Sequence, residues 1–407
     1  MPDLPPGPRG LPAVGSFLTI RLTNRLTFLE RLAATYGDVS SYHVFGARSI
    51  LVNDPGLARD VLRNRSGCYE ATFPPPLAAL ELITPPASRW TRAGDRTASV
   101  ARATGSVDTD GSVDRLATIV ADVVDDSAAR WPPGGTVELA AEAGVLAAGL
   151  LRSALLGMPA DRQAAALLGD ALVFALSRGA APRPADRAAQ QQWRAAVHGL
   201  RDAALAGRPA DEETTAHRAA GFAPVMLATY SPLSTALLWA AFVLATRPSL
   251  RGAVLDELGD RPLSAALGAP YLSGVIRELL RLYPPAYALT RRATADDTVG
   301  GFLVPAGTKV ILSPYLLHRR PDCWPDPLEF DPERFAADGA TGVHLPFGAG
   351  AKACPGQAIA VILLQLTVAA LARRTRFEPA WTGPVRPAPG WALRPDRPLP
   401  ARVAPTD

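Results

Sequence analysis

The sequence predicts a mainly α-helical protein with a minor β part, formed by a single domain over residues 1–407. Alanine-rich segments with helical spacing fill residues 113–206, whereas segments of β character occur only before residue 53 and after residue 289. With 48% hydrophobic and 20% charged residues, the chain can bury a large core. No linker or change of composition marks a boundary in the middle, so one domain is favoured over two.

Local signals place the individual elements. Leucines at helical spacing follow Asn24 and end at Gly37, and Asp54 followed by proline begins the next helix. Pro284 and Pro285 end a later one. The expected elements are helices over residues 24–36, 55–62, 248–258, 271–282 and 355–373, strands at 39–44, at 49–52 and within 290–312, and ordered loops over 72–88 and 321–350.

Residues 219–246 carry no charge and are long enough to span a bilayer. The run also contains two prolines and several hydroxyl side chains, and arginine-rich segments flank it on both sides. These features favour a helix buried through the centre of the domain over a membrane span.

Charge and cysteine content exclude several classes of function. The formal charge of +4 is spread along the chain, which does not indicate a nucleic-acid partner. Three scattered cysteines fit neither a disulfide framework nor a zinc site, and they indicate a reducing compartment. The N-terminus lacks the pattern of a signal peptide, so we expect a cytoplasmic protein.

The strongest local motif is the glycine-rich segment over residues 347–356. Gly348 and Gly350 allow bends that a side chain would obstruct, and Cys354 precedes Pro355 at the start of the last predicted helix. A thiol at a helix N-terminus has a lowered pKa and is suited to bind a metal centre as thiolate. An isolated cysteine is otherwise most often an inert buried residue.

This segment resembles the cysteine loop of the cytochrome P450 family, Phe-Gly-x-Gly-x-[His/Arg]-x-Cys-x-Gly. Lys352 replaces the usual His or Arg and keeps a cationic donor without bidentate geometry. The resemblance implies the cytochrome P450 fold, haem b (iron protoporphyrin IX) as cofactor, and Cys354 as the iron ligand. The implied cofactor-binding residues are Cys354, Lys352, Arg291, Trp90, Phe347, Gly348 and Gly356.

Two further segments match the family. Glu278 and Arg281 lie three apart on one helix face, and Arg334 follows in Pro-Glu-Arg-Phe. The resemblance implies that these three residues form a buried network. Arg291, favoured over Arg292, corresponds to a position that binds a haem propionate by a charge-assisted hydrogen bond.

The central helix departs from the family. Where relatives carry an acid followed by threonine, this chain has Ser231 and Pro232, within a segment that also includes Ala228 and Thr229. Proline donates no hydrogen bond, and we expect it to open the helix. The proton relay can then come from a water held by Ser231 and the freed carbonyl near Ala228, or from the substrate. Peroxide-driven turnover and non-hydroxylating chemistry, such as rearrangement, ring closure or dehydration, are the alternatives. Another departure is Gly94, four residues after Trp90, where the family usually has arginine.

The resemblance to the family implies which segments line the substrate pocket, and their residues are mostly apolar. We therefore expect the substrate to be a lipophilic small molecule that is oxidised in a tailoring step of secondary metabolism. A haem-binding sensor or carrier is the non-enzymatic alternative. No flavin or nicotinamide fingerprint appears, so ferredoxin and ferredoxin reductase are the expected electron donors. The proline-rich start without a preceding anchor helix implies a soluble protein. The expected pocket residues are Phe73, Leu82, Ile83, Met226, Tyr287, Leu289 and Trp391.

Overall fold

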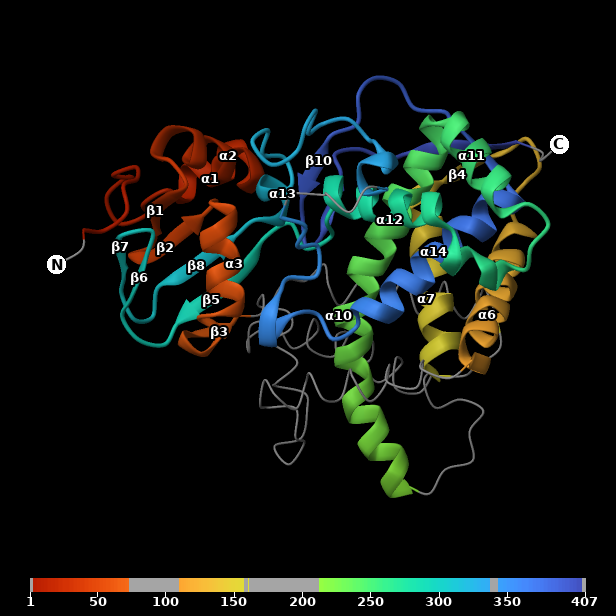
Figure 1. Ribbon diagram of the computed structural model, residues 1–407, viewed down its shortest axis with the longest axis horizontal. Helices are drawn as coiled ribbons and strands as arrows, with labels where there is room; N and C mark the ends of the chain where they lie inside the picture. The colour runs from red at the N-terminus through yellow and green to blue at the C-terminus, as the bar shows by residue number, and fades with distance from the viewer. Residues whose placement is uncertain (1–2, 73–109, 157–159, 161–211, 337–342, 405–407) are drawn as a thin grey trace, which may run out of the picture. The chain divides into compact units, whose positions relative to one another are not determined.

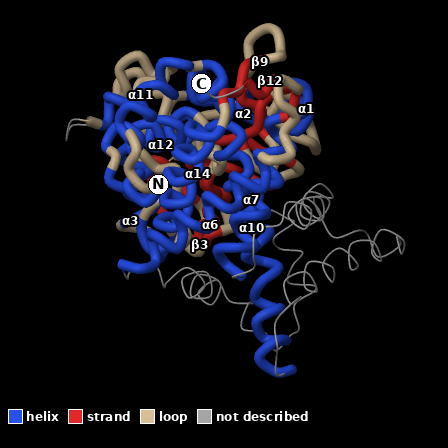
Figure 2. The backbone as a smooth tube through the Cα atoms, turned by 90° about the vertical axis from the view of Figure 1, so that its right-hand side faces the viewer, coloured by secondary structure: helices blue, strands red, loops and turns tan. Residues whose placement is uncertain are grey.

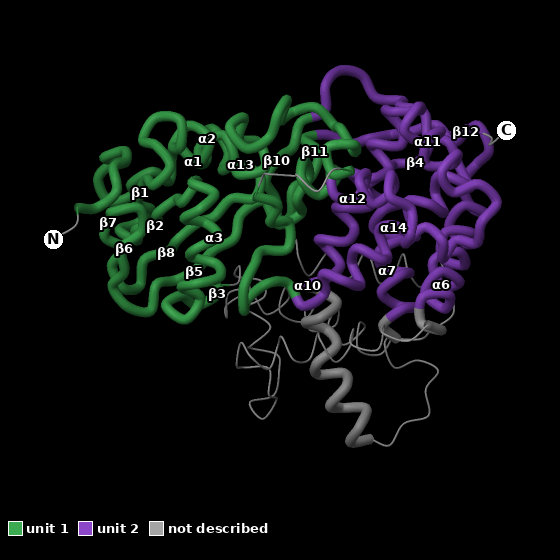
Figure 3. Tube along the Cα trace, viewed as in Figure 1, with its two compact units in different colours: residues 1–73, 278–354, 386–396 green, residues 74–277, 355–385, 397–407 purple. Residues whose placement is uncertain are grey.

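The structure, a computed structural model, describes residues 3–72, 110–156, 160, 212–336 and 343–404. The side chains of α10 are described from Ala228 onward. The chain forms two compact units, each built from several segments (Figure 3). Unit 1 comprises residues 1–73, 278–354 and 386–396, and unit 2 comprises residues 74–277, 355–385 and 397–407.

Unit 1 is built around a five-stranded sheet with the order β1-β2-β8-β5-β3 (Figure 1). Strands β2 and β8 are parallel, with Ser49 opposite Lys309, and the other neighbours are antiparallel. The strands are β1 (Val39–Val44), β2 (Ala47–Val52), β3 (Tyr69–Ala71), β5 (Leu289–Ala293) and β8 (Lys309–Leu312).

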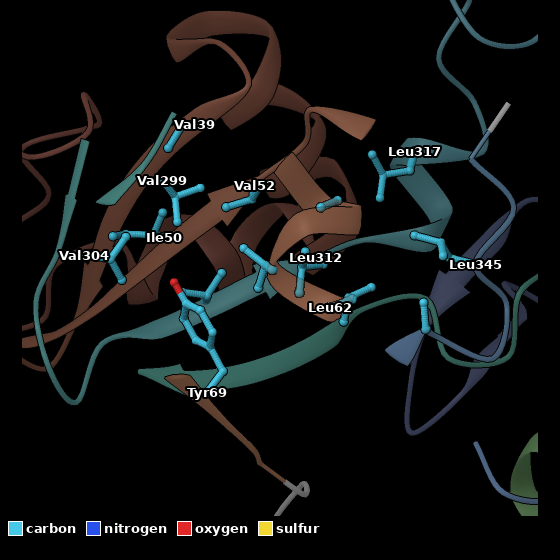
Figure 4. Close-up of a cluster of buried hydrophobic side chains, with 14 of the residues drawn as sticks. Val39, Ile50, Val52, Leu62, Tyr69, Val299, Val304, Leu312, Leu317 and Leu345 are labelled. Atoms are coloured by element: carbon cyan, nitrogen blue, oxygen red, sulfur yellow. The ribbon is translucent and has the colours of Figure 1, made fainter. Parts of the chain in front are cut away.

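Hydrophobic side chains of the sheet form the core of unit 1. Ile50 and Leu312 are fully buried in one cluster, which also includes Leu62 and Leu345 (Figure 4). Leu345 precedes the cysteine loop, so the start of this loop is anchored in the sheet core. The remaining elements of this unit are α1 (Phe17–Thr23), α2 (Arg25–Tyr36), α3 (Pro55–Arg63), α13 (Pro314–Leu317), the hairpins β6 (Asp297–Val299) with β7 (Phe302–Val304) and β10 (Pro387–Pro389) with β11 (Leu393–Pro395), and 3₁₀ turns η1 (Ser66–Cys68), η5 (Pro332–Phe335) and η6 (Gly350–Lys352).

Unit 2 is mostly helical, with one small sheet (Figure 2). Helix α10 packs against α7 and α14, and α14 also packs against α6. Strand β12 pairs with β4 and β9. The elements are α6 (Asp110–Ala128), β4 (Thr136–Glu138), α7 (Leu139–Leu156), α10 (Glu212–Thr246), α11 (Pro248–Leu258), η4 (Leu263–Gly268), α14 (Gln357–Arg374), β9 (Arg376–Pro379) and β12 (Pro400–Ala404). Helix α12 (Pro270–Leu282) has residues in both units.

Helix α10 contains the uncharged run. Two helices are long and apolar enough to cross a membrane, but 83% of the stretch Ala228–Thr246 and 61% of Gln357–Arg374 are buried inside the protein. The interpretation of the run as a buried helix is therefore confirmed for its described side chains. Helix α10 continues through Pro232, so the proline does not end the helix. Proline has no N–H to donate to the Ala228 carbonyl.

Most predicted boundaries agree within two residues, and α11 agrees at both ends. The last helix begins at Gln357, so Pro355 and Gly356 form the turn before it. Most of α6 and all of α7 lie in the predicted helical region 113–206, but residues 129–138 between them form a turn and strand β4, which the prediction missed. Residues 157–159 and 161–206 of this region, and residues 73–88 of the predicted loop, lie outside the described residues. The three-residue strands carry too little periodicity to be found from sequence.

Candidate functional site

The cysteine loop turns sharply between Phe347 and Cys354. Gly348 and Gly350 adopt φ values of +72° and +71°, in the left-handed region that favours glycine. The Cys354 N–H donates to the Phe347 carbonyl at 2.9 Å and closes the turn. The Cys354 side chain is exposed, three residues before the first residue of α14. The turn therefore presents a thiol beside the start of a helix.

The loop packs closely on the end of α3. A Cβ atom at Gly350 would lie 2.1 Å from the Leu62 carbonyl oxygen, so only glycine permits this approach. The Lys352 ammonium group donates to the Ser66 carbonyl in η1. These contacts fix the loop against α3 and η1 from one side.

On α12, Glu278 and Arg281 form a fully buried ion pair. The Arg281 Nε and one terminal nitrogen donate to the two Glu278 carboxylate oxygens at 2.6 and 2.8 Å. Arg281 also donates to the carbonyls of His318, Pro327 and Glu329 at 2.7, 2.7 and 3.0 Å. All five guanidinium N–H groups thus have acceptors, and the buried charge is compensated.

Arg334 completes this network, in the position implied by the family resemblance. Its Nε donates to Glu278 at 3.2 Å, and one terminal nitrogen donates to the Pro325 carbonyl at 2.7 Å. The Asp331 N–H also donates to Glu278, at 2.9 Å. One carboxylate therefore gathers α12 and the segment over residues 325–334.

His318 connects this network to the cysteine loop. Its Nδ1 lies 3.0 Å from the Arg281 carbonyl, and its Nε2 accepts the Leu345 N–H at 2.8 Å. Since Nε2 accepts, Nδ1 carries the proton and donates to the Arg281 carbonyl. Burial lowers the pKa of His318 well below its usual value, which keeps the imidazole neutral. The Gly348 N–H in turn donates to the Leu345 carbonyl at 3.1 Å, so the chain of bonds continues into the loop.

Arg291 is a buried cation on β5. It is 7% exposed, it donates a hydrogen bond to the carbonyl of its own neighbour Thr290, and it has no carboxylate partner among the described residues. Burial lowers the pKa of this guanidinium. Leu289, on the same face of β5, contacts the cysteine loop, since a Cβ at Gly348 would lie 3.5 Å from its Cδ1. Arg292 points to the opposite face and is exposed.

On α10, the Ser231 hydroxyl is fully buried and Thr235 is 1% exposed, and neither hydroxyl has a hydrogen-bond partner in the described part of the chain. At 3.6 residues per turn, Ala228, Ser231, Pro232 and Thr235 share an arc of about 100°. The Ala228 carbonyl on this arc lacks its helical donor, because residue 232 is proline. One face of α10 therefore combines two unpaired hydroxyls with a free carbonyl.

The other predicted residues are placed as follows. Tyr287 is 8% exposed, donates to the Gly390 carbonyl at 3.2 Å and belongs to a core cluster of unit 1. Thr229, Leu289, Phe347, Gly356 and Trp391 are half-buried. Phe73, Leu82, Ile83 and Trp90, and the side chain of Met226, lie outside the described residues.

No role for His318 was predicted from the sequence, although this residue lies in the matched segment between Arg281 and Arg334. Helical spacing cannot reveal it, because its partners are the backbone groups of residues 281 and 345. Its only signal is a lone histidine beside apolar residues in a segment that already matches a family motif.

The family model of the cytochrome P450 matches residues 200–399. The chain is 36% identical over 165 residues to the thromboxane-A synthase of Mus musculus, which covers 38% of this chain and 31% of that protein. It is 36% identical over 179 residues to the cyclooctatin synthase of Streptomyces melanosporofaciens, covering 42% and 39%. The matching stretches thus span about a third of the length of these relatives.

A third relative, cyclooctat-9-en-7-ol 5-monooxygenase of the same Streptomyces species, is 43% identical over 127 residues, covering 30% of this chain and 26% of that protein. Among solved structures, the retinoic acid-bound cyanobacterial CYP120A1 has a TM-score of 0.82 at 21% identity and covers 99% of both chains, which shows the fold. The chain belongs to the cytochrome P450 family.

The residues present fit the haem that this family implies. In the cytochrome P450 family a cysteine thiolate holds the haem iron, and cationic side chains suit the two haem carboxylates. Cys354 presents a sulfur at the closed turn, and Arg291 is a buried guanidinium without a carboxylate among the described residues. A buried unpaired cation is costly, and an anionic group supplied by a ligand removes this cost.

Replacing Glu278 with alanine is expected to leave Arg281 and Arg334 without their shared carboxylate. The free energy of unfolding should fall by about 3–5 kcal/mol, measured by urea denaturation. Asp125→Ala is the matched control, because it breaks an exposed pair with Arg374 and should cost at most about 1 kcal/mol. Equal losses in the two variants would contradict the role of the buried carboxylate.

In the His318→Leu variant, the Leu345 N–H should lose its hydrogen-bond acceptor, while leucine fills the buried position of the imidazole. Hydrogen exchange at Leu345 is expected to accelerate by about tenfold or more, since a buried donor loses its acceptor. His43→Leu is the control, because its Nε2 accepts from Arg48 at 3.1 Å within the β1–β2 hairpin. Unchanged protection of Leu345 in His318→Leu would show that the imidazole does not hold the loop.

Proposed function

We propose that this protein is a haem-thiolate monooxygenase that oxidises a lipophilic small molecule in a tailoring step of secondary metabolism. The proposal rests on the closed cysteine turn, which lies beside strand β5. Arg291 on this strand is buried and forms no ion pair with a carboxylate in the described part of the chain. The family match and relatives named as monooxygenase and synthase support it.

The residues of the turn, and those that would bind the haem beside it, each have a defined role in this proposal. Cys354 supplies the thiolate ligand to the iron of haem b. Arg291 donates to a propionate, with Trp90 and Lys352 as further donors. When bound, the haem supplies the oxidising chemistry that amino-acid side chains lack. Gly348 and Gly350 let the backbone carry the thiol at this position, and the bonds through His318 keep the turn rigid.

Helix α10 supplies the proton path in this proposal. The Ser231 and Thr235 hydroxyls and the free Ala228 carbonyl are suited to hold a water molecule, because a buried water needs two to four polar partners. This water takes the place of the acid and threonine that the family uses. Ser231 can donate to it and accept from it, so a proton can pass along the helix face.

A second function is favoured by Pro232, which stands at the position of the family's threonine. A helix without this donor suits turnover with peroxide, or a rearrangement, ring closure or dehydration that needs no proton delivery to oxygen. The synthase names of two relatives are compatible with such chemistry.

The proposed substrate class follows from the apolar pocket residues and the relatives. The name cyclooctat-9-en-7-ol denotes an unsaturated hydrocarbon skeleton with one hydroxyl group, and we infer an intermediate of this lipophilic kind. The pocket would comprise Phe73, Leu82, Ile83, Met226, Tyr287, Leu289 and Trp391. Ferredoxin and ferredoxin reductase would supply electrons to a soluble, cytoplasmic enzyme, with residues 1–407 as a single haem-thiolate domain.

The haem assignment predicts the spectrum of two cysteine variants and the haem content of two arginine variants. The reduced protein with carbon monoxide should show the thiolate signature, and Cys354→Ala should lose it while Cys323→Ala keeps it. Arg291→Leu should retain less haem than the wild type, because a propionate loses its donor, whereas Arg292→Leu should bind haem normally. A thiolate signature that persists in Cys354→Ala would refute the assignment.

The proposed proton path predicts how tightly electron consumption is coupled to product formation. With NAD(P)H and redox partners, the wild type should couple electron consumption to product. Ser231→Ala and Thr235→Val should each release several times more hydrogen peroxide per product. Ser234→Ala is the control, since that hydroxyl donates to the Ser231 carbonyl at 3.1 Å. Efficient turnover with peroxide and none with NAD(P)H would instead support the second function.

A further inference from the structure

Lys352 is a half-buried cation in the cysteine loop, at a position where the family usually carries histidine or arginine. Its ammonium group donates to the Ser66 carbonyl in η1, and it forms no ion pair with a carboxylate in the described part of the chain. An ammonium group has three N–H donors and no acceptor. One donor of Lys352 is therefore used on the backbone of the protein itself.

The acceptor of this bond lies in η1, which is fixed to strand β5. The Cys68 N–H donates to the Arg65 carbonyl at 2.9 Å and closes η1. The N–H and the hydroxyl of Thr294, directly after β5, both donate to the Cys68 carbonyl at 2.9 Å. Strand β3 follows η1 and pairs with β5, with Ala71 opposite Arg291. The position of η1 relative to Arg291 is therefore set by several hydrogen bonds.

The donor of this bond lies two residues before Cys354. The Ala353 N–H donates to the Gly350 carbonyl at 3.0 Å and closes the turn that precedes the cysteine. Gly350 contacts the carboxyl end of α3 without a side chain, whereas Lys352 adds a hydrogen bond to η1. A hydrogen bond from a charged donor is roughly twice as strong as one between neutral groups. Lys352 thus connects the segment that carries Cys354 with the strands that carry Arg291.

Lysine suits this contact better than the residues that the family usually has. Its compact ammonium group lies on a flexible four-carbon stem and can approach a single carbonyl oxygen. The planar guanidinium group of arginine is matched to the two oxygens of a carboxylate, and a neutral histidine has only one N–H donor. The replacement at position 352 therefore favours a bond to the backbone.

We propose that Lys352 is a positioning residue, whose bond to Ser66 holds the cysteine loop on η1 and sets the position of Cys354 relative to Arg291. This inference rests on the proposed function, because the position matters only if Cys354 and Arg291 bind the same haem. The role is separate from donation to a propionate. Loss of the bond should change the state of the thiolate ligand more than the haem content.

The first test is amide hydrogen exchange of the full-length protein. Lys352→Met keeps a long side chain and removes the donor. The Cys354 and Cys68 amides should both exchange about tenfold faster, because both ends of the connection become mobile. Lys352→Arg should restore part of the protection, since a guanidinium can also donate to one carbonyl. Lys309→Met is the control, because it removes the other lysine of the chain, which is exposed on β8.

A double-mutant cycle tests whether the connection runs through η1. Thr294→Val removes the hydroxyl that donates to the Cys68 carbonyl and keeps the backbone bond. On its own, it should accelerate exchange of the Cys354 amide by about threefold. Combined with Lys352→Met it should add nothing, because the connection is already broken. Additive effects of the two substitutions would contradict the proposal.

The haem-loaded protein supplies a spectroscopic measurement. With carbon monoxide and reductant, Lys352→Met should lose the thiolate signature several times faster than the wild type. Its haem content should stay within about twofold of the wild type, because Arg291 keeps its propionate. Lys352→Arg should slow the loss of the signature again.

The outcomes separate this role from the proposed function. If Lys352→Met loses haem but keeps the wild-type exchange rates of Cys354 and Cys68, Lys352 acts only as a propionate donor and the inference is overturned. Unchanged exchange together with an unchanged signature overturns it as well. If the wild type itself shows no thiolate signature, the proposed function fails, and the role of Lys352 fails with it.

Discussion

The buried carboxylate of Glu278 is the interaction on which the sheet-containing unit depends. It accepts hydrogen bonds from Arg281, Arg334 and the Asp331 backbone. A carboxylate taken out of water is costly unless it is paired and hydrogen-bonded, and here two guanidinium groups and an amide donate to it. The Glu278–Arg281 pair is connected to the cysteine turn by His318. This imidazole is hydrogen-bonded to the Arg281 carbonyl on α12 and to the Leu345 N–H, and so fixes the position of Leu345 relative to α12.

The arrangement separates the chemistry from its support. Cys354 and Arg291 are placed by groups that never contact a cofactor: the α3 carboxyl end, the neighbouring strand β8 and the imidazole of His318. A metal ligand held by such a rigid shell keeps its geometry without flexible side chains of its own. In the helical unit, by contrast, the Ser231 and Thr235 hydroxyls near Pro232 have no hydrogen-bond partner in the described part of the chain.

Much of the architecture was predictable, because it depends on local signals. Asp54 with Pro55 begins α3, and Gly37 ends α2, where the structure has them. The buried pair of Glu278 and Arg281 could be foreseen from the family motif, whereas its links to His318, Pro327 and Glu329 could not. Those links end on backbone carbonyls, which leave no trace in the side-chain pattern. The single buried helix predicted over residues 219–246 continues through Pro232, because packing in a core tolerates one absent hydrogen bond.

All five Arg281 donors are hydrogen-bonded, and this limits which segments of the chain can be exchanged with those of a relative. Its acceptors lie at residues 278, 318, 327 and 329, and the connected histidine reaches residue 345. These positions must come from backbones that already fit each other, because all five donor–acceptor distances lie between 2.6 and 3.0 Å. In a chimera with a relative, residues 278–345 therefore form one inheritable block, and productive crossovers fall outside it.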